Sequence, residues 1–184
     1  MIESENTDIS STTVKNNNEN KKNSIGKNNI KFIKLLSDIL NQICDENKPN
    51  EDEKLNLMKP FTVKKIPLIT LYNYIERLCK YSQVSDGTFI LTLIYIDRIC
   101  GFYKINLNYF NIHKLFLASF IAAIKYHEDN YYSMEFYAKI GGVSLKEIIN
   151  LEYEFMKLIH FNLFVSDDLF SKYENNLLNC ENDY

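Results

Sequence analysis

Two nearly uninterrupted apolar segments constrain the fold of this chain more than any other feature of its sequence. They are "TFILTLIYIDRIC" at residues 88–100 and "KLFLASFIAAIKYH" at residues 114–127. Drawn as helices, both are apolar almost all the way round, which is typical of helices that lie inside a domain. Each apolar run is shorter than the roughly 18 residues needed to span a membrane. The two segments therefore predict inner helices that are covered by amphipathic ones.

Amphipathic segments before this pair predict covering helices. From Ile30 to Ile43, apolar residues recur at steps of three and four, which predicts an N-terminal helix at about 30–47. A second stripe follows Pro67, which suits the first turn of a helix because it has no N–H to satisfy. No segment favours a strand over a helix, although "FNLFV" at 161–165 is ambiguous. The predicted class is all-α.

Small polar residues and glycines mark the boundaries of the later helices. Ser85 and Ser133 stand just before apolar patterns, where a hydroxyl can cap a helix N-terminus. The pair Gly141-Gly142 can close a short helix, and "SLKE" at 144–147 is a capping box. The last of these signals predicts a long helix through "IINLEYEFMKLIHFNL".

The chain is predicted to hold one domain behind a tail. Residues 1–29 are rich in Asn, Lys and Ser and lack a hydrophobic period, so we expect a disordered tail. The domain should span 30–178, with its core at about 66–165 and a final helix at about 166–178. A length of 184 residues, of which 46% are hydrophobic, agrees with a single globular domain.

The net charge indicates which partners are disfavoured, and the cysteines indicate the compartment. The net charge of −3 provides no basic field of the kind that attracts nucleic acid or an anionic membrane surface. The four cysteines are widely spaced and form no C-x-x-C pair, which favours free thiols in a reducing compartment. We therefore expect a nuclear or cytoplasmic protein, or one found in both places, with neither nucleic acid nor membrane as a partner.

Motifs of enzymes and metal sites are missing from the sequence. The three histidines are far apart, and there is no H-E-x-x-H, phosphate loop or nucleophile elbow. The stretch "YHED" at 126–129 is an alternative cation site, but polar residues that close a helix explain it more simply. The prediction is that the protein is not an enzyme and has no cofactor, metal site, catalytic residue or small-molecule substrate.

Two charged residues lie where the apolar patterns predict burial. Lys125 stands near the end of the inner segment 114–127, and Glu152 falls on the apolar side of its helix, about 200° from Glu154. Lys125 has a simpler explanation, in which a lysine in the last turn favours the helix dipole and extends into water. Because an unpaired buried charge costs several kcal/mol, the two either pair with each other or bind a partner together at an exposed site.

Asp97 poses a smaller problem of the same kind, since it stands near the end of an apolar helix. We expect a structural salt bridge between Asp97 and a nearby cation, with Arg77 as one candidate.

Several motifs in one order resemble the cyclin box. They are "YIDRI", "LASFIAAIKYHED" and "LEYEFMKLIHFNLF", with "YAKIGGVS" as the most diagnostic turn. Over roughly residues 30–175 the chain is most similar to the P/U-type cyclins, the group that includes phosphate-pathway cyclins of yeast and plants. The resemblance implies a single five-helix cyclin-box fold with an additional N-terminal helix.

The resemblance also implies a function, which is to bind and activate a cyclin-dependent protein kinase as a heterodimer. The activator would stabilise the active position of the kinase's PSTAIRE-type helix, in cell division or another pathway. The kinase-binding positions implied by the family pattern are Lys125, Glu152, Tyr126, Glu128, Met156, Phe161 and Leu163.

Departures from the family pattern leave other functions open. His127 replaces a residue that is more often acidic, and "PLITLYNY" replaces the MRAIL-type substrate-docking motif. The chain is expected to hold one cyclin box and no second. One alternative is a cyclin-fold adaptor that does not activate a kinase, as in transcription factors, but that class favours a basic surface and two repeats. Another is a helical scaffold in which Lys125 has no special role.

Overall fold

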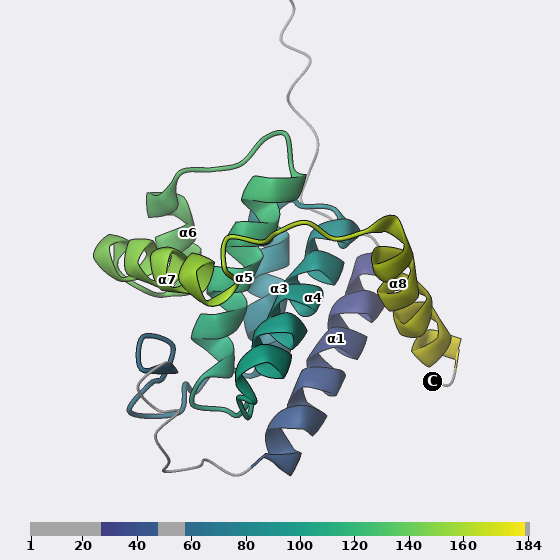
Figure 1. The fold of residues 1–184 in the computed structure, drawn as a ribbon, viewed down its shortest axis with the longest axis horizontal. Helices are drawn as coiled ribbons and strands as arrows, with labels where there is room; N and C mark the ends of the chain where they lie inside the picture. The colour runs from purple at the N-terminus through teal and green to yellow at the C-terminus, as the bar shows by residue number, and fades with distance from the viewer. Residues whose placement is uncertain (1–26, 48–57, 183–184) are drawn as a thin grey trace, which may run out of the picture.

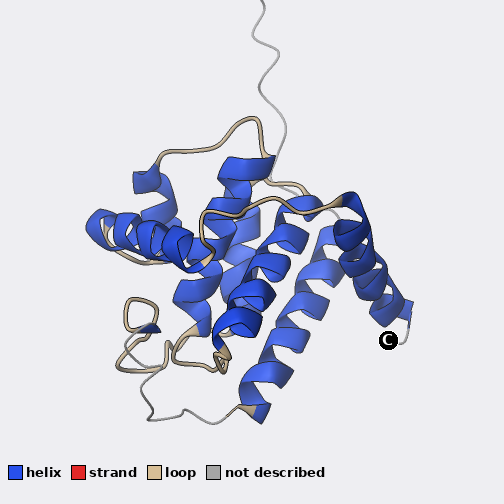
Figure 2. Ribbon diagram, viewed as in Figure 1, coloured by secondary structure: helices blue, strands red, loops and turns tan. Residues whose placement is uncertain are grey.

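All of the regular structure that can be described is helical. The computed structural model describes residues 27–47 and 58–182 (Figure 1). Its helices are α1 (Lys27–Glu46), α3 (Leu71–Ser82), α4 (Asp86–Tyr103), α5 (Ile112–His127), α6 (Met134–Gly141), α7 (Leu145–Leu158) and α8 (Asp167–Asn182). The part of the chain that is described contains no strand, and "FNLFV" is a loop (Figure 2). The all-α prediction is confirmed.

The predicted tail lies outside the described residues, except for its last three, which belong to α1. The final helix is longer than expected, since α8 continues to Asn182 rather than ending near residue 178.

The two apolar segments form the inner helices α4 and α5, as predicted. Every residue of α5 from Ile112 to Ile124 is buried except Lys114. Helix α5 packs against α4 on one side and α7 on another, while α1 contacts α3 and α8. In Figure 1, α6 and α7 therefore lie on the opposite side of the inner helices from α8. This arrangement places one end of α5 beside α7, at the surface.

Side-chain caps at three helix N-termini test the sequence signals, and two of the three were predicted. The hydroxyls of Ser133 and Ser144 accept hydrogen bonds from the backbone N–H groups of Phe136 and Glu147, as the sequence predicts. The prediction for Pro67 is wrong, because α3 begins later, at Leu71. Thr70 has an extended backbone, and its hydroxyl accepts a hydrogen bond from the backbone N–H of Asn73. The N-cap side chain therefore sets the start of α3, and the proline does not.

The two glycines at the end of α6 serve different purposes. A Cβ on Gly141 would lie 2.6 Å from Cδ2 of Leu117, so α6 packs against α5 closely enough that a larger residue here would force the Leu117 side chain to shift. Gly142 has φ of 73° and ends α6 in the left-handed conformation, which costs glycine least. Together they turn the chain sharply into α7.

Candidate functional site

Lys125 and Glu152 form an ion pair that joins the end of α5 to α7. Nζ of Lys125 lies 2.5 Å from Oε1 of Glu152, and the two side chains are 32% and 23% exposed. The structure thus forms the first of the two arrangements expected from the sequence. An ammonium has three N–H donors, so this pair leaves donors for the oxygen atoms of a partner.

Glu128 fixes the end of α5 by capping a different helix. Its carboxylate accepts hydrogen bonds from the backbone N–H of Ser85 at 2.9 Å, the Ser85 hydroxyl at 2.7 Å and the Thr88 hydroxyl at 2.5 Å. Ser85 stands at the N-cap of α4 as predicted, but its own hydroxyl does not cap the helix. The cap is supplied by Glu128, which lies 43 residues further along the chain.

These bonds also keep Glu128 ionised. Burial alone would raise the pKa of Glu128, but hydrogen bonds from Thr88 and Ser85 hold that pKa below its usual range. The family pattern implies that Glu128 contacts a kinase. Its carboxylate is already bound within the fold, three residues beyond Lys125, so its effect on the site includes holding the end of α5 in place.

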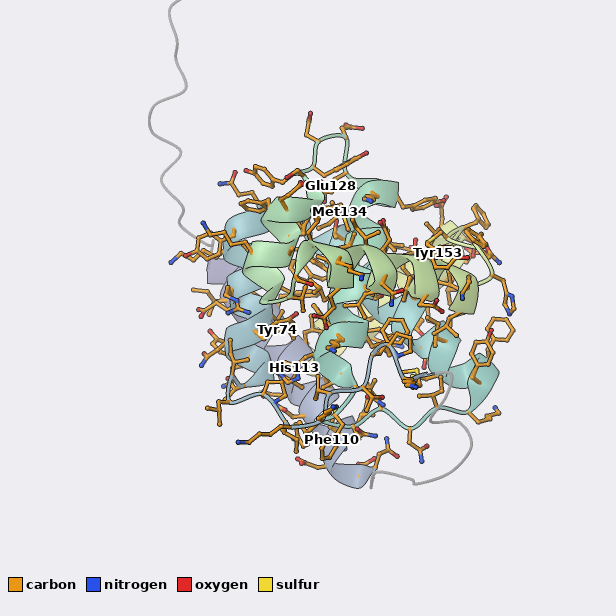
Figure 3. All side chains as sticks on the ribbon, turned by 90° about the vertical axis from the view of Figure 1, so that its left-hand side faces the viewer. Tyr74, Phe110, His113, Glu128, Met134 and Tyr153 are labelled. Atoms are coloured by element: carbon orange, nitrogen blue, oxygen red, sulfur yellow. The ribbon has the colours of Figure 1, made fainter. Side chains whose placement is uncertain are left out.

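Glu152 lies within a stripe of apolar side chains on the surface of α7. Ile149 and Met156 are three and four residues from Glu152, spacings that make them its neighbours on the helix, and Tyr153 is four residues from Ile149. Ile149 and Tyr153 are exposed, and Met156 is partly buried (Figure 3 labels Tyr153). Sequence reasoning missed Ile149 and Tyr153, although the spacing of Ile149 from Glu152, and of Tyr153 from Ile149, was a signal that could have found them.

The remaining predicted positions differ in their exposure. Tyr126, next to Lys125, is exposed, and Phe161 is 66% exposed after the end of α7. Leu163 is partly buried and packs against the core. Phe164 is 69% exposed and was not predicted. Exposed large apolar side chains gathered near an ion pair indicate an interaction surface rather than a reaction centre.

The predicted salt bridge between Asp97 and Arg77 is wrong. Among the ion pairs of the described residues, neither side chain takes part. The Tyr173 hydroxyl of α8 donates to the Asp97 carboxylate at 2.6 Å, whereas the Arg77 guanidinium lies over the Tyr74 ring. The reason is that the two side chains face different helices: Asp97 faces α8, whereas Arg77 lies beside Gly142 at the end of α6.

Residues 27–47 and 58–182 contain neither a cluster of metal ligands nor a helix able to span a membrane. No cluster of three or more His, Cys, Asp or Glu side chains in these ranges could hold a metal ion. No helix there is both long and apolar enough to cross a membrane.

Comparison with known proteins agrees with this geometry. The family model described as "Cyclin" matches residues 3–163. The PHO85 cyclin-like protein psl1 of Schizosaccharomyces pombe is 39% identical over 108 residues, which are 58% of this chain and 44% of that protein. PHO85 cyclin-7 of Saccharomyces cerevisiae is 34% identical over 159 residues, covering 80% of this chain and 55% of the relative. Cyclin-U4-1 of Arabidopsis thaliana is 32% identical over 149 residues, covering 78% of this chain and 72% of the relative.

The chain therefore belongs to the cyclin family. Its similarity to PHO85 cyclins and to U-type cyclins of Arabidopsis confirms the predicted P/U type within that family. The aligned part spans about half the length of the two yeast relatives.

Proposed function

We propose that this chain is the regulatory subunit of a cyclin-dependent protein kinase, which it binds and activates by stabilising the active position of the PSTAIRE-type helix. The observation that supports this most directly is the Lys125–Glu152 pair within the apolar stripe of α7. Large exposed apolar side chains gathered beside a charged pair mark a site of protein–protein interaction. Membership of the cyclin family supports a kinase as the partner.

Activation in this proposal is a shift between two populations of the kinase. A kinase whose mobile helix carries a catalytic Glu is active only when that helix is swung inward. A partner that binds the inward form more tightly stabilises it, and a shift from mostly inactive to mostly active needs a differential of about 5 kcal/mol. The cyclin contributes no catalytic atom, only binding energy.

The ion pair has a specific task in such an interface. The last carbonyl groups of a helix carry partial negative charge and lack intrahelical donors. The Lys125 ammonium can donate to such carbonyl oxygens in the kinase, while Glu152 holds it in position. Charge-assisted hydrogen bonds of this kind are about twice as strong as neutral ones.

The experiment measures binding and kinase activity with purified cyclin-dependent kinases. One of them is the PHO85 protein of S. cerevisiae, after which the yeast relatives are named. Lys125→Ala should weaken binding by at least about 30-fold, because removing one partner of an interfacial charge pair costs about 2 kcal/mol or more. Lys114→Ala is the matched control, since Lys114 pairs with Glu147 at 2.8 Å on the same two helices.

Each outcome decides one part of the proposal. If Lys125→Ala activates the kinase as well as the unchanged chain does, the site assignment is wrong. If the unchanged chain binds a kinase without raising its activity, the adaptor function is correct instead. If it binds none of the kinases, the proposed function fails.

A further inference from the structure

The segment that follows α7 holds two residues in an unfavourable backbone conformation. His160 and Phe161 both have φ of 54°, in the left-handed region. Neither is glycine, and a bulky residue in this conformation costs roughly 1–2 kcal/mol. Phe161 is also 66% exposed. Strain of this kind persists only where the surroundings hold it.

Part of what holds the segment is its own turn. The backbone N–H of Phe161 donates to the Met156 carbonyl at 2.9 Å, and the N–H of Asn162 donates to the Ile159 carbonyl at 3.0 Å. These bonds close the end of α7, but they do not attach the residues beyond Asn162 to the rest of the domain.

Side chains from α4 make that attachment through three consecutive carbonyl groups. The Arg98 guanidinium donates to the carbonyls of Asn162 at 2.5 Å and Phe164 at 3.0 Å. The Tyr95 hydroxyl donates to the carbonyl between them, that of Leu163, at 2.8 Å. Tyr95 and Arg98 are one turn apart on α4, and the guanidinium lies 5.8 Å from the centre of the Tyr95 ring.

The shape of the guanidinium suits this task. Its planar fork presents several donors in fixed directions, so a single side chain can bridge two carbonyl groups, which the point charge of a lysine does less well. Bonds from a charged donor are also stronger than neutral ones. Arg98 therefore sets the path of the segment that carries the two exposed rings, Phe161 and Phe164.

We infer that Arg98 and Tyr95 are positioning residues, which hold the segment from His160 to Phe164 so that the Phe161 and Phe164 rings are already placed to bind the kinase. This inference rests on the proposed function, because it assigns these rings to the same interface. Ordering a loop before binding removes an entropic cost from the binding step. Neither positioning residue needs to touch the partner.

The test uses the full chain, the kinase that it binds, and Arg98→Ala beside Arg77→Ala. Arg77 is a matched control because its guanidinium lies over Tyr74, away from the segment. In the free protein, Arg98→Ala should speed hydrogen exchange at the Phe161 and Asn162 amides by about 10-fold or more. Affinity for the kinase should fall by about 10-fold, and Arg77→Ala should change neither quantity.

A combined mutant separates positioning from direct contact. If Arg98 acts through the Phe161 and Phe164 rings, then Arg98→Ala added to a variant with both Phe161→Ala and Phe164→Ala should weaken binding by less than about 2-fold further. Arg98→Lys should restore part of the affinity. Tyr95→Phe removes only the hydroxyl, so it remains informative if Arg98→Ala fails to fold, and it should reproduce the faster exchange and weaker binding.

Two kinds of result would overturn the inference. Unchanged exchange in both Arg98→Ala and Tyr95→Phe would show that these two side chains do not hold the segment. Full additivity with the variant that lacks both phenylalanine rings would show that Arg98 acts independently of the rings. Either result, obtained while Lys125→Ala still weakens binding, would leave the proposed function standing, whereas an unchanged chain that binds no kinase would end both proposals.

Discussion

The carboxylate of Glu152 lies 2.5 Å from the ammonium of Lys125, although 27 residues separate them in the chain. Their side chains remain 23% and 32% exposed. Ion pairs at such exposure contribute only about 0–1 kcal/mol to stability. A pair that does little for the fold yet interrupts an apolar surface points to recognition of a partner.

Reversing the two charges tests that interpretation. The double variant Lys125→Glu with Glu152→Lys keeps an ion pair between α5 and α7, so the free energy of unfolding should change by less than about 1 kcal/mol. It places a carboxylate where carbonyl oxygens of the kinase should be bound, so binding should be lost. Denaturant unfolding and calorimetric titration with the kinase give the two quantities. Binding at unchanged strength would mean that the pair serves only the fold.

Glu128→Gln should destabilise the domain without abolishing kinase binding. The amide keeps an oxygen but loses the charge that strengthens three hydrogen bonds at the start of α4. We expect a loss of about 1 kcal/mol, as for other N-cap changes, measured by urea unfolding at pH 7. Asp129→Asn is the control, since Asp129 is the exposed neighbour. A kinase affinity that collapses while stability stays constant would instead support direct contact by Glu128.

The same carboxylate gives a pH dependence with a definite sign. The pKa of Glu128 in the folded protein lies below the ordinary value of 4.5. The contribution of Glu128 to stability is therefore fully present above about pH 4.5 and is lost as the pH falls through the folded-state pKa. Between pH 5 and pH 3, Glu128→Gln should lose stability less steeply than the unchanged chain.

Glu128 also illustrates which contacts can be predicted from the sequence and which cannot. Local patterns predicted the helices and the caps at Ser133 and Ser144, because each depends on residues within about one turn. The cap at Ser85 comes from a carboxylate 43 residues away, and Arg98 reaches carbonyl groups 64 and 66 residues away. Such contacts follow from how the helices pack, which helical periodicity does not specify.

The Asp97 prediction failed for the same reason. The sequence showed that Asp97 required a partner but did not show which helix it faces. Packing of α8 against α4 supplies a tyrosine hydroxyl in place of the expected arginine.

Acidification should destabilise the domain through His113, which is buried at the start of α5. Its ring nitrogen Nε2 lies 3.3 Å from the Ile69 carbonyl, and its ring packs 5.1 Å from that of Tyr74 (Figure 3). Burial lowers the pKa of His113 below 6.5, more than the Ile69 carbonyl raises it, and nearby Arg77 lowers it further. The neutral ring is therefore favoured in the folded state.

The sign follows from proton linkage. The unfolded chain takes up a proton near pH 6.5 and the folded chain only below that, so stability falls with pH from about pH 7 downward, by at most about 1.4 kcal/mol per unit. His113→Gln should flatten the profile of unfolding free energy between pH 7 and pH 5. His127→Gln, at an exposed position, is the control. An unchanged slope in His113→Gln would exclude His113 as the source.

Two glycine-to-alanine changes should have opposite effects on stability. In Gly141→Ala the new methyl group would lie 2.6 Å from Leu117, which is completely buried, so we expect a loss of about 1–3 kcal/mol. Gly101 lies within α4 with no atom within 4 Å of an added Cβ, so Gly101→Ala should gain about 0.5–1 kcal/mol. Denaturant unfolding measures both. Equal effects would contradict the close approach of α6 to α5.

Phe161→Asn should raise the stability of the free protein and lower its affinity for the kinase. Asparagine tolerates the left-handed conformation that Phe161 adopts, and the exposed ring contributes little to the core, so we expect a gain of roughly 0.5–1 kcal/mol. Phe164 is equally exposed but does not have positive φ, so Phe164→Asn should weaken binding without the gain. Thermal unfolding and titration with the kinase distinguish the two variants. If Phe161→Asn destabilises the free protein, the Phe161 ring stabilises the fold. Its unfavourable backbone conformation would then be explained by folding and not by kinase binding.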